Sequence, residues 1–191
     1  MVRDSLESDD AALLAWETLA RRYVYRSRWL TARRDHVRLP GGHELEDYYV
    51  LEYPDWAQAL LLTPDDEVVL VEIYRHGLGK VHLELPGGCV EGGESPEHAA
   101  RREAREETGY EARVWSSLGW VCANPATHDN RSHMFLGTGA FLAGCARPEA
   151  GEQLRTRLTP LAQIPDLLEA GAVVQASHAY ALATLLRARG V

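Results

Sequence analysis

The chain has 191 residues, with 20 Lys and Arg against 28 Asp and Glu, a formal net charge of −8, 46% hydrophobic residues and 25% charged residues. These values are ordinary for one globular domain with a small appendage, and they argue against disorder, collagen and coiled coil. The negative charge also argues against non-specific binding to nucleic acid or to an anionic membrane, because both need basic patches.

The N-terminus and the cysteines predict a cytoplasmic protein. The first residues are acidic and lack the apolar stretch of a secretory signal peptide. The longest uncharged stretch, residues 170–186, is too short and too polar to span a membrane. The three cysteines form an odd, sparse set, which fits reduced thiols.

The first predicted element is a short helix over residues 8–22, because Ser8 or Asp9 can cap it and several leucines give it a partial apolar face. A hairpin of two strands, 34–39 and 43–53, is expected around a Pro-Gly-Gly turn. Further strands are expected at 57–62, 67–74, 112–122, 133–142 and 154–158, and C-terminal helices at 164–170 and 176–189. Strands interleaved with few helices predict a layered α/β or α+β domain.

A glycine-rich segment, residues 83–94, precedes the best-defined helix, residues 96–108. Ser95 is a good N-cap, Pro96 suits the first helical position, and Gly109 suits the residue that follows the helix. The glycines permit a backbone turn that packs closely against the start of the helix.

One face of this helix is acidic. At 100° per residue, three carboxylates share a face with two small residues, and two arginines lie on the opposite face. The carboxylates are Glu103, Glu106 and Glu107, the small residues are Ala99 and Ala100, and the arginines are Arg101 and Arg105. The small residues favour packing of the acidic face, which is costly unless a cation compensates the charge. A solvated acidic face is the alternative, and the adjacent glycine-rich segment favours a site for a divalent metal.

These residues resemble the box of the Nudix hydrolase family, in which a Gly and a Glu precede Arg-Glu, Glu-Glu and a second Gly at fixed spacing. All seven specified residues are present, namely Gly88, Glu94, Arg102, Glu103, Glu106, Glu107 and Gly109. The resemblance implies an α/β/α sandwich with a mixed β-sheet, here with an N-terminal antiparallel extension. It also implies metal-dependent hydrolysis of a nucleoside diphosphate linked to another moiety.

Carried over residue by residue, the resemblance implies that Glu103, Glu106 and Glu107 are ligands of Mg²⁺ or Mn²⁺. Glu94 would be an additional ligand, and so would the carbonyl of Gly87. Arg102 would orient the acidic cluster through a salt bridge. Metal ions of this kind would also explain how a protein of net charge −8 binds an anionic substrate.

Outside the box, the chain resembles the ADP-ribose pyrophosphatase branch, which converts ADP-ribose to AMP and ribose 5-phosphate. Arg75, at the end of a strand, corresponds to an arginine that contacts the substrate, and Pro125 is a mark of that branch. The segment 29–52 resembles the branch's N-terminal sheet, which commonly exchanges between the subunits of a homodimer. Trp29 is our candidate for stacking on adenine.

The domain expectation follows from these readings. Residues 1–33 would form an N-terminal helix and a lead-in segment, and residues 34–191 would form the Nudix domain. The hairpin of residues 34–53 would contribute to a dimer interface.

The catalytic base and the substrate are less defined. The family often uses a loop glutamate as the base, and of the two in that region, Glu149 and Glu152, we favour Glu152. Pro-Gly-Gly at residues 86–88 replaces the Pro-Ala-Gly of many ADP-ribose enzymes. The substrate could therefore be GDP-mannose or another nucleotide sugar, and a nucleotide-sensing module without catalysis is the rival reading.

Overall fold

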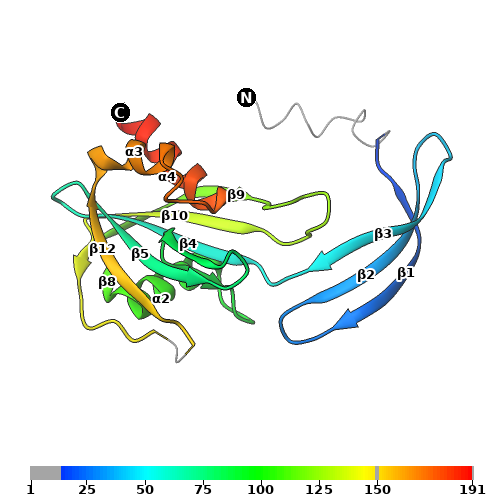
Figure 1. Cartoon of the computed structure of the whole chain (residues 1–191), viewed down its shortest axis with the longest axis horizontal. Helices are drawn as coiled ribbons and strands as arrows, with labels where there is room; N and C mark the ends of the chain where they lie inside the picture. The colour runs from blue at the N-terminus through cyan, green and yellow to red at the C-terminus, as the bar shows by residue number, and fades with distance from the viewer. Residues whose placement is uncertain (1–13, 149–150, 191) are drawn as a thin grey trace. The chain divides into compact units, whose positions relative to one another are not determined.

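The computed structural model describes residues 14–148 and 151–190, which separate into two compact units (Figure 1). The first unit is the chain up to Tyr53 together with residues 124–129. The second unit comprises residues 54–123 and the chain from Asn130 onward.

The first unit contains a three-stranded antiparallel sheet in the order β1-β2-β3. Its strands are β1 (Glu17–Arg26), β2 (Thr31–Arg38) and β3 (Glu44–Glu52). The expected hairpin is present as β2 and β3, and the turn between them contains Gly42 with φ 83°. This positive φ is one that glycine adopts at no steric cost.

The expected helix over residues 8–22 is wrong from Glu17 onward, while residues 8–13 lie outside the described residues. From Glu17 to Arg26 the chain pairs with β2 along its whole length. The apolar face of the supposed helix was only partial, whereas the ladder with β2 satisfies the backbone, and residues 23–25 are aromatic or β-branched.

The second unit is built on a mixed sheet in the order β12-β5-β4-β10-β9, with β6 paired to β5 and β7 paired to β4. The parallel pair is β4 with β10, and the other pairs are antiparallel. The strands are β4 (Trp56–Leu62), β5 (Glu67–Arg75), β6 (Lys80–Glu84), β7 (Gly87–Cys89), β9 (Val114–Val121), β10 (Ser132–Thr138) and β12 (Leu154–Pro160). A separate pair consists of β8 (Tyr110–Glu111) and β11 (Phe141–Leu142).

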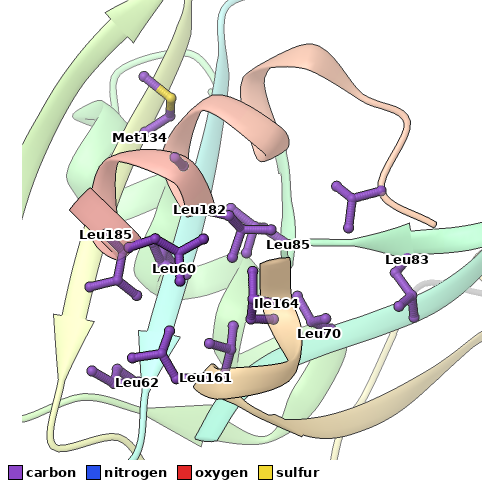
Figure 2. Close-up of a cluster of buried hydrophobic side chains, with 14 residues drawn as sticks. Leu60, Leu62, Leu70, Leu83, Leu85, Met134, Leu161, Ile164, Leu182 and Leu185 are labelled. Carbon is purple, nitrogen blue, oxygen red and sulfur yellow. The ribbon is translucent and has the colours of Figure 1, made fainter. Parts of the chain in front are cut away.

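Helices cover both faces of this sheet because β4 and β5 are apolar on both faces. Leu60 and Leu70 pack with α3 (Ile164–Glu169), the short η2 turn before it (Leu161–Gln163) and α4 (Ala176–Arg189), as Figure 2 shows. Leu61 and Val69 pack on the other face against α2 (Pro96–Thr108). The predicted α/β/α sandwich is therefore confirmed. Among the described residues, no helix is long and apolar enough to cross a membrane.

Candidate active site

The helix α2 begins and ends where its caps predict. The Ser95 side chain accepts a hydrogen bond from the backbone N–H of His98 (3.2 Å), and Pro96 opens the helix. Gly109 closes it in the left-handed conformation, with φ 75°, and its N–H donates to the carbonyl of Arg105. These caps fix which side chains face the sheet.

The acidic face of α2 is a packed face, as expected. Ala99, Ala100 and Ala104 are fully buried against the sheet. On the same side, Glu103 and Glu107 retain only 8% and 2% of their accessible surface. The side chain of Glu106, by contrast, is 45% exposed. Two carboxylates are therefore buried beside the sheet, and a third lies at the edge of the site.

The short strand β7 brings the glycine-rich segment against these carboxylates. It pairs with β4, and the N–H of Gly87 donates to Oε2 of Glu107 at 2.8 Å. A Cβ added to Gly88 would collide with the carboxylate of Glu103. The sequence predicts a backbone turn in this segment, and part of the segment is a strand, because its backbone pairs with β4. The absence of a side chain at Gly88 leaves room for Glu103.

Arg102 connects the carboxylates to one another. Its Nη2 donates to Oε1 of Glu94 (2.8 Å) and to the carbonyl of Cys89 (3.1 Å). Its Nη1 donates to Oε1 of Glu103 (2.8 Å) and to Oε2 of Glu106 (3.1 Å). The hydrogen bonds from Arg102 are the main cause that lowers the pKa of Glu94 to about 2.

Burial makes it harder for two of these carboxyl groups to ionise. Burial, helped by the nearby charges of Glu103 and Glu152, raises the pKa of Glu107 to about 8, although the N–H of Gly87 and the charge of Arg75 oppose the shift. Burial likewise raises the pKa of Glu103, although Arg102 opposes the shift. A bound divalent ion would stabilise the ionised form of both carboxylates.

The residues fit such an ion by their chemistry. Within the described part of the chain, no three His, Cys, Asp or Glu side chains converge as a ready metal site. Arg102 binds oxygens of Glu103 and Glu106, and Glu107 is bound to the N–H of Gly87. The donor set nevertheless consists of hard oxygen atoms, which Mg²⁺ and Mn²⁺ prefer.

Arg75 faces the same acidic region from β5. The charges of Glu107 and Glu152 contribute to raising its pKa, after the larger effect of its hydrogen bonds to Glu84. Glu152 is therefore near Arg75, Glu103 and Glu107, whereas Glu149 lies outside the described residues.

Two other candidates belong to the first unit. Trp29 lies in the β1–β2 turn with 68% of its surface exposed, and the guanidinium of Arg28 stands 4.1 Å from its ring centroid. Pro125 lies in the turn of residues 124–128, also in the first unit. The structure does not bring either residue together with α2 in one unit.

Glu84 and His82, both buried on β6, were missed by the sequence reasoning. Glu84 accepts two hydrogen bonds from Arg75 and lies 2.7 Å from Nε2 of His82. A sequence signal existed, since Glu84 stands between Leu83 and Leu85, and a buried carboxylate needs a partner. The partner was not predictable without the register of β5 and β6.

Comparison with known proteins agrees with this arrangement. Residues 53–176 match the model of the NUDIX domain, and residues 16–51 match the model of the nucleoside diphosphate sugar hydrolase N-terminal domain. A solved structure, described as the crystal structure of ADP compounds hydrolase, superposes with a TM-score of 0.80 and covers 92% of this chain and 96% of its own at 24% identity.

Two curated relatives are informative. A CMP-5'-(N-acetyl-N-hydroxy-3-aminopropyl)phosphonate hydrolase of Streptomyces rubellomurinus is 34% identical over 91% of this chain and 83% of its own length. An ADP-ribose pyrophosphatase of Mycobacterium tuberculosis is 32% identical, with the match covering 71% of this chain and 64% of the relative. The matched region thus spans less than two thirds of that second relative.

Proposed function

The chain belongs to the Nudix hydrolase family, and from that premise we propose that it hydrolyses the pyrophosphate of ADP-ribose to give AMP and ribose 5-phosphate. Water adds across the P–O–P bridge, so that each product keeps one phosphate. The observation that carries the proposal is the burial of Glu103 and Glu107 beside β7, with the charge of Arg75 acting on the same region.

The proposed metal ligands are Glu103, Glu106, Glu107 and the carbonyl of Gly87, with Glu94 as an additional one. Bound Mg²⁺ or Mn²⁺ would supply charge neutralisation of the pyrophosphate and a more acidic water. Glu94 already shares Arg102 with Glu103 and Glu106. In the proposal, Arg102 orients these carboxylates and keeps them ionised, because its guanidinium stabilises their charged form.

Two further side chains have proposed roles toward the substrate. Arg75 would donate hydrogen bonds to a phosphate oxygen, since a guanidinium matches the geometry of phosphate. Glu152 is proposed as the base that accepts a proton from the attacking water. Its closeness to Glu103, Glu107 and Arg75 supports this role.

The first unit is proposed to bind the nucleoside part of the substrate and to form a dimer interface. We propose that the chain is a cytoplasmic homodimer in which the hairpin of residues 34–53 contributes to the interface. Trp29 would stack on adenine, and Pro125 would shape the loop nearby. The exposure of the Trp29 ring supports this use, because an aromatic face available to solvent can accept a base.

A second candidate substrate is a CMP-linked phosphonate. The match to the Streptomyces rubellomurinus enzyme, over 91% of this chain, favours it. Such a substrate presents a similar bridge between two phosphorus atoms to the same acidic region. It differs from ADP-ribose in its base and in its second moiety, and in the proposal the first unit would recognise these parts.

A substrate panel tests the proposal. The chain is incubated with Mg²⁺ and either ADP-ribose, GDP-mannose, a CMP-linked phosphonate or a diadenosine polyphosphate, and the mononucleotide released is measured. ADP-ribose should give the highest kcat/KM. A higher value for GDP-mannose or the CMP compound would reject ADP-ribose as the preferred substrate, and binding of ADP-ribose without product would favour the nucleotide-sensing alternative.

A further inference from the structure

The hairpin of β5 and β6 carries a buried ionic group beside the acidic region. The side chain of Glu84 is 3% exposed, that of Arg75 is 36% exposed, and the two form a two-pronged ion pair. Nε of Arg75 donates to Oε1 of Glu84 at 2.9 Å, and Nη2 donates to Oε2 at 2.8 Å. This geometry holds the guanidinium plane in one orientation.

Strand register explains why these side chains meet. Glu84 pairs with Val71, and His82 pairs with Ile73, so both project from the same face of the hairpin as Arg75. Leu83, between them, projects to the opposite face, where it packs in the cluster under α3 and α4. The ion pair therefore lies on the face of the sheet that α2 covers.

A second buried group holds the carboxylate of Glu84. Nε2 of His82 lies 2.7 Å from Oε1 of Glu84, and the His82 side chain is also 3% exposed. Although burial pushes the pKa of Glu84 upward, the hydrogen bond from Arg75, the charges of His178 and Arg75, and the hydrogen bond with His82 hold it below its usual value. Glu84 is thus an ionised carboxylate fixed from two sides.

The charge of Arg75 also interacts with carboxylates of the acidic region. The fork uses Nε and Nη2 and does not include Nη1. The carboxylates of Glu107 and Glu152 are close enough to raise the pKa of Arg75, although less than the contact with Glu84 does. An arginine side chain has four rotatable bonds and loses conformational freedom when it binds a phosphate, and prior fixation reduces that loss.

We propose that Glu84 is a positioning residue, which holds Arg75 in the orientation that binds a pyrophosphate oxygen of the substrate, and that His82 in turn holds Glu84. The inference rests on the proposed function, because it assigns Arg75 to the substrate. Glu84 acts only through Arg75 and touches neither the substrate nor the reacting atoms. Replacing Glu84 should therefore lower kcat/KM only while Arg75 is present.

A double-mutant cycle tests this dependence in the full chain. Glu84→Gln, Arg75→Ala and the double variant are compared by kcat/KM on the best substrate of the panel, with unfolding temperatures measured in parallel. Glu84→Gln alone should lower kcat/KM by about 10- to 100-fold, by analogy with other side chains that orient a binding group. In the Arg75→Ala background, the same change should alter kcat/KM by less than about 3-fold. An equal loss in both backgrounds would overturn the proposal.

The matched control is Glu72→Gln on β5, the strand that carries Arg75. Glu72 also accepts hydrogen bonds from an arginine, Arg155, but it alternates with Ile73 onto the opposite face. This variant should keep kcat/KM within about 2-fold of the wild type, since changes at distant, independent sites do not couple. Arg75→Lys is a second variant that tests the proposal if Glu84→Gln does not fold. It keeps the positive charge but cannot form the two-pronged ion pair with Glu84. It should therefore show the same loss of kcat/KM as expected for Glu84→Gln. Wild-type kinetics in Arg75→Lys would contradict the proposal.

Failure of the proposed function is separable from failure of this inference. If the wild type hydrolyses no member of the panel, the proposed function fails, and calorimetric binding of inorganic pyrophosphate in Mg²⁺ replaces turnover in the same cycle. Weaker pyrophosphate binding by Glu84→Gln, seen only with Arg75 present, would still support the inference. Unchanged binding, or no binding by the wild type, would overturn it.

Discussion

The carboxylates of α2 differ in burial, so substitutions at these positions should differ in their effect on stability. Glu103 and Glu107 are buried, so replacing them changes packing as well as charge. The side chain of Glu106 is 45% exposed and accepts a hydrogen bond from Arg102, four residues earlier. Glu106 is therefore the position where a charge can be removed with the least effect on stability.

We predict that Glu106→Gln lowers turnover by at least about 100-fold, because even residues that only orient metal ligands are worth roughly 10–100-fold. The unfolding temperature should stay near that of the wild type. The control is Glu97→Gln on the same helix, whose side chain is 44% exposed and pairs with Arg101 four residues on. Near-normal turnover in Glu106→Gln, or an equal loss in Glu97→Gln, would refute a role in the reaction.

His178 sets a different test, one of stability against pH. It is buried at the start of α4, and its Nδ1 accepts a hydrogen bond from the N–H of Leu85. Burial lowers its pKa from 6.5 to about 4, more than the neighbouring Glu84 raises it. Between these two pH values the unfolded chain binds the proton and the folded chain does not, so acidification favours unfolding.

We predict that this histidine removes about 3 kcal/mol of stability, at most, as the pH falls from 6.5 to about 4. Above pH 6.5 its contribution should be constant. In His178→Asn the amide oxygen can replace Nδ1 as the acceptor, and the titration is absent. Urea unfolding at pH 7 and pH 4.5 should show a smaller loss in the variant than in the wild type. The same loss in both would show that His178 does not carry the effect.

At the scale of elements, β7 depends on its two glycines. A Cβ at Gly87 would come within 2.9 Å of the Cα of Gln58 on β4, whereas a Cβ at Gly88 would meet the side chain of Glu103. At Gly92, in the turn that follows, a Cβ would have nothing within 4 Å, and its φ is not positive. Gly87 therefore makes room for β4 and Gly88 makes room for Glu103, whereas nothing around Gly92 requires a glycine.

We predict that Gly88→Ala lowers kcat by at least about 10-fold, because displacing a side chain that must be held closely is costly. Its unfolding temperature should fall less than that of Gly87→Ala, which disturbs the backbone of β4. Gly92→Ala should change neither kcat nor the unfolding temperature. The assignment would be wrong if Gly92→Ala and Gly88→Ala had the same kinetics.

Local chemistry made α2 predictable. Its caps are Ser95 and Gly109, its acidic face follows from 3.6-residue periodicity, and the structure has the same helix bounds. The strand β1 was not predictable in this way, because its stability comes from pairing with β2 rather than from its own pattern. The same holds for β7 and for Glu84, whose partners are set by sheet register.

At the scale of the whole molecule, the chain divides into two units whose boundaries differ from the expected ones, 1–33 and 34–191. The chain leaves the second unit at Asn124 and returns at Asn130, so a short loop between β9 and β10 belongs to the first unit. Within that unit the loop contacts β3, where the N–H of Leu51 donates to the carbonyl of Thr127 at 2.7 Å. This loop belongs to the first unit because it contacts residues that are distant in the sequence, and such contacts cannot be predicted from composition.

We predict that the protein is a dimer in solution, with twice the 21.3 kDa mass of one chain. In the first unit, Val24 and Tyr25 on β1 are 50% and 57% exposed, and β1 pairs with β2 of the hairpin proposed for the interface. Val24→Asp should shift sedimentation toward the monomer. Val114→Asp, at a residue of the second unit that is 62% exposed, is the control and should not. A monomeric wild type at micromolar concentration would exclude the proposed homodimer.

The central claim is that the acidic face of α2 works with a divalent ion on a pyrophosphate. Its most direct test follows ADP-ribose turnover by the wild type while Mg²⁺ is varied from excess chelator to saturation. We predict no AMP in chelator, a saturable rise with Mg²⁺, and a much lower plateau or a need for more Mg²⁺ in Glu106→Gln. Turnover that is undiminished in chelator, or a Mg²⁺ dependence that Glu106→Gln leaves unchanged, would contradict the claim.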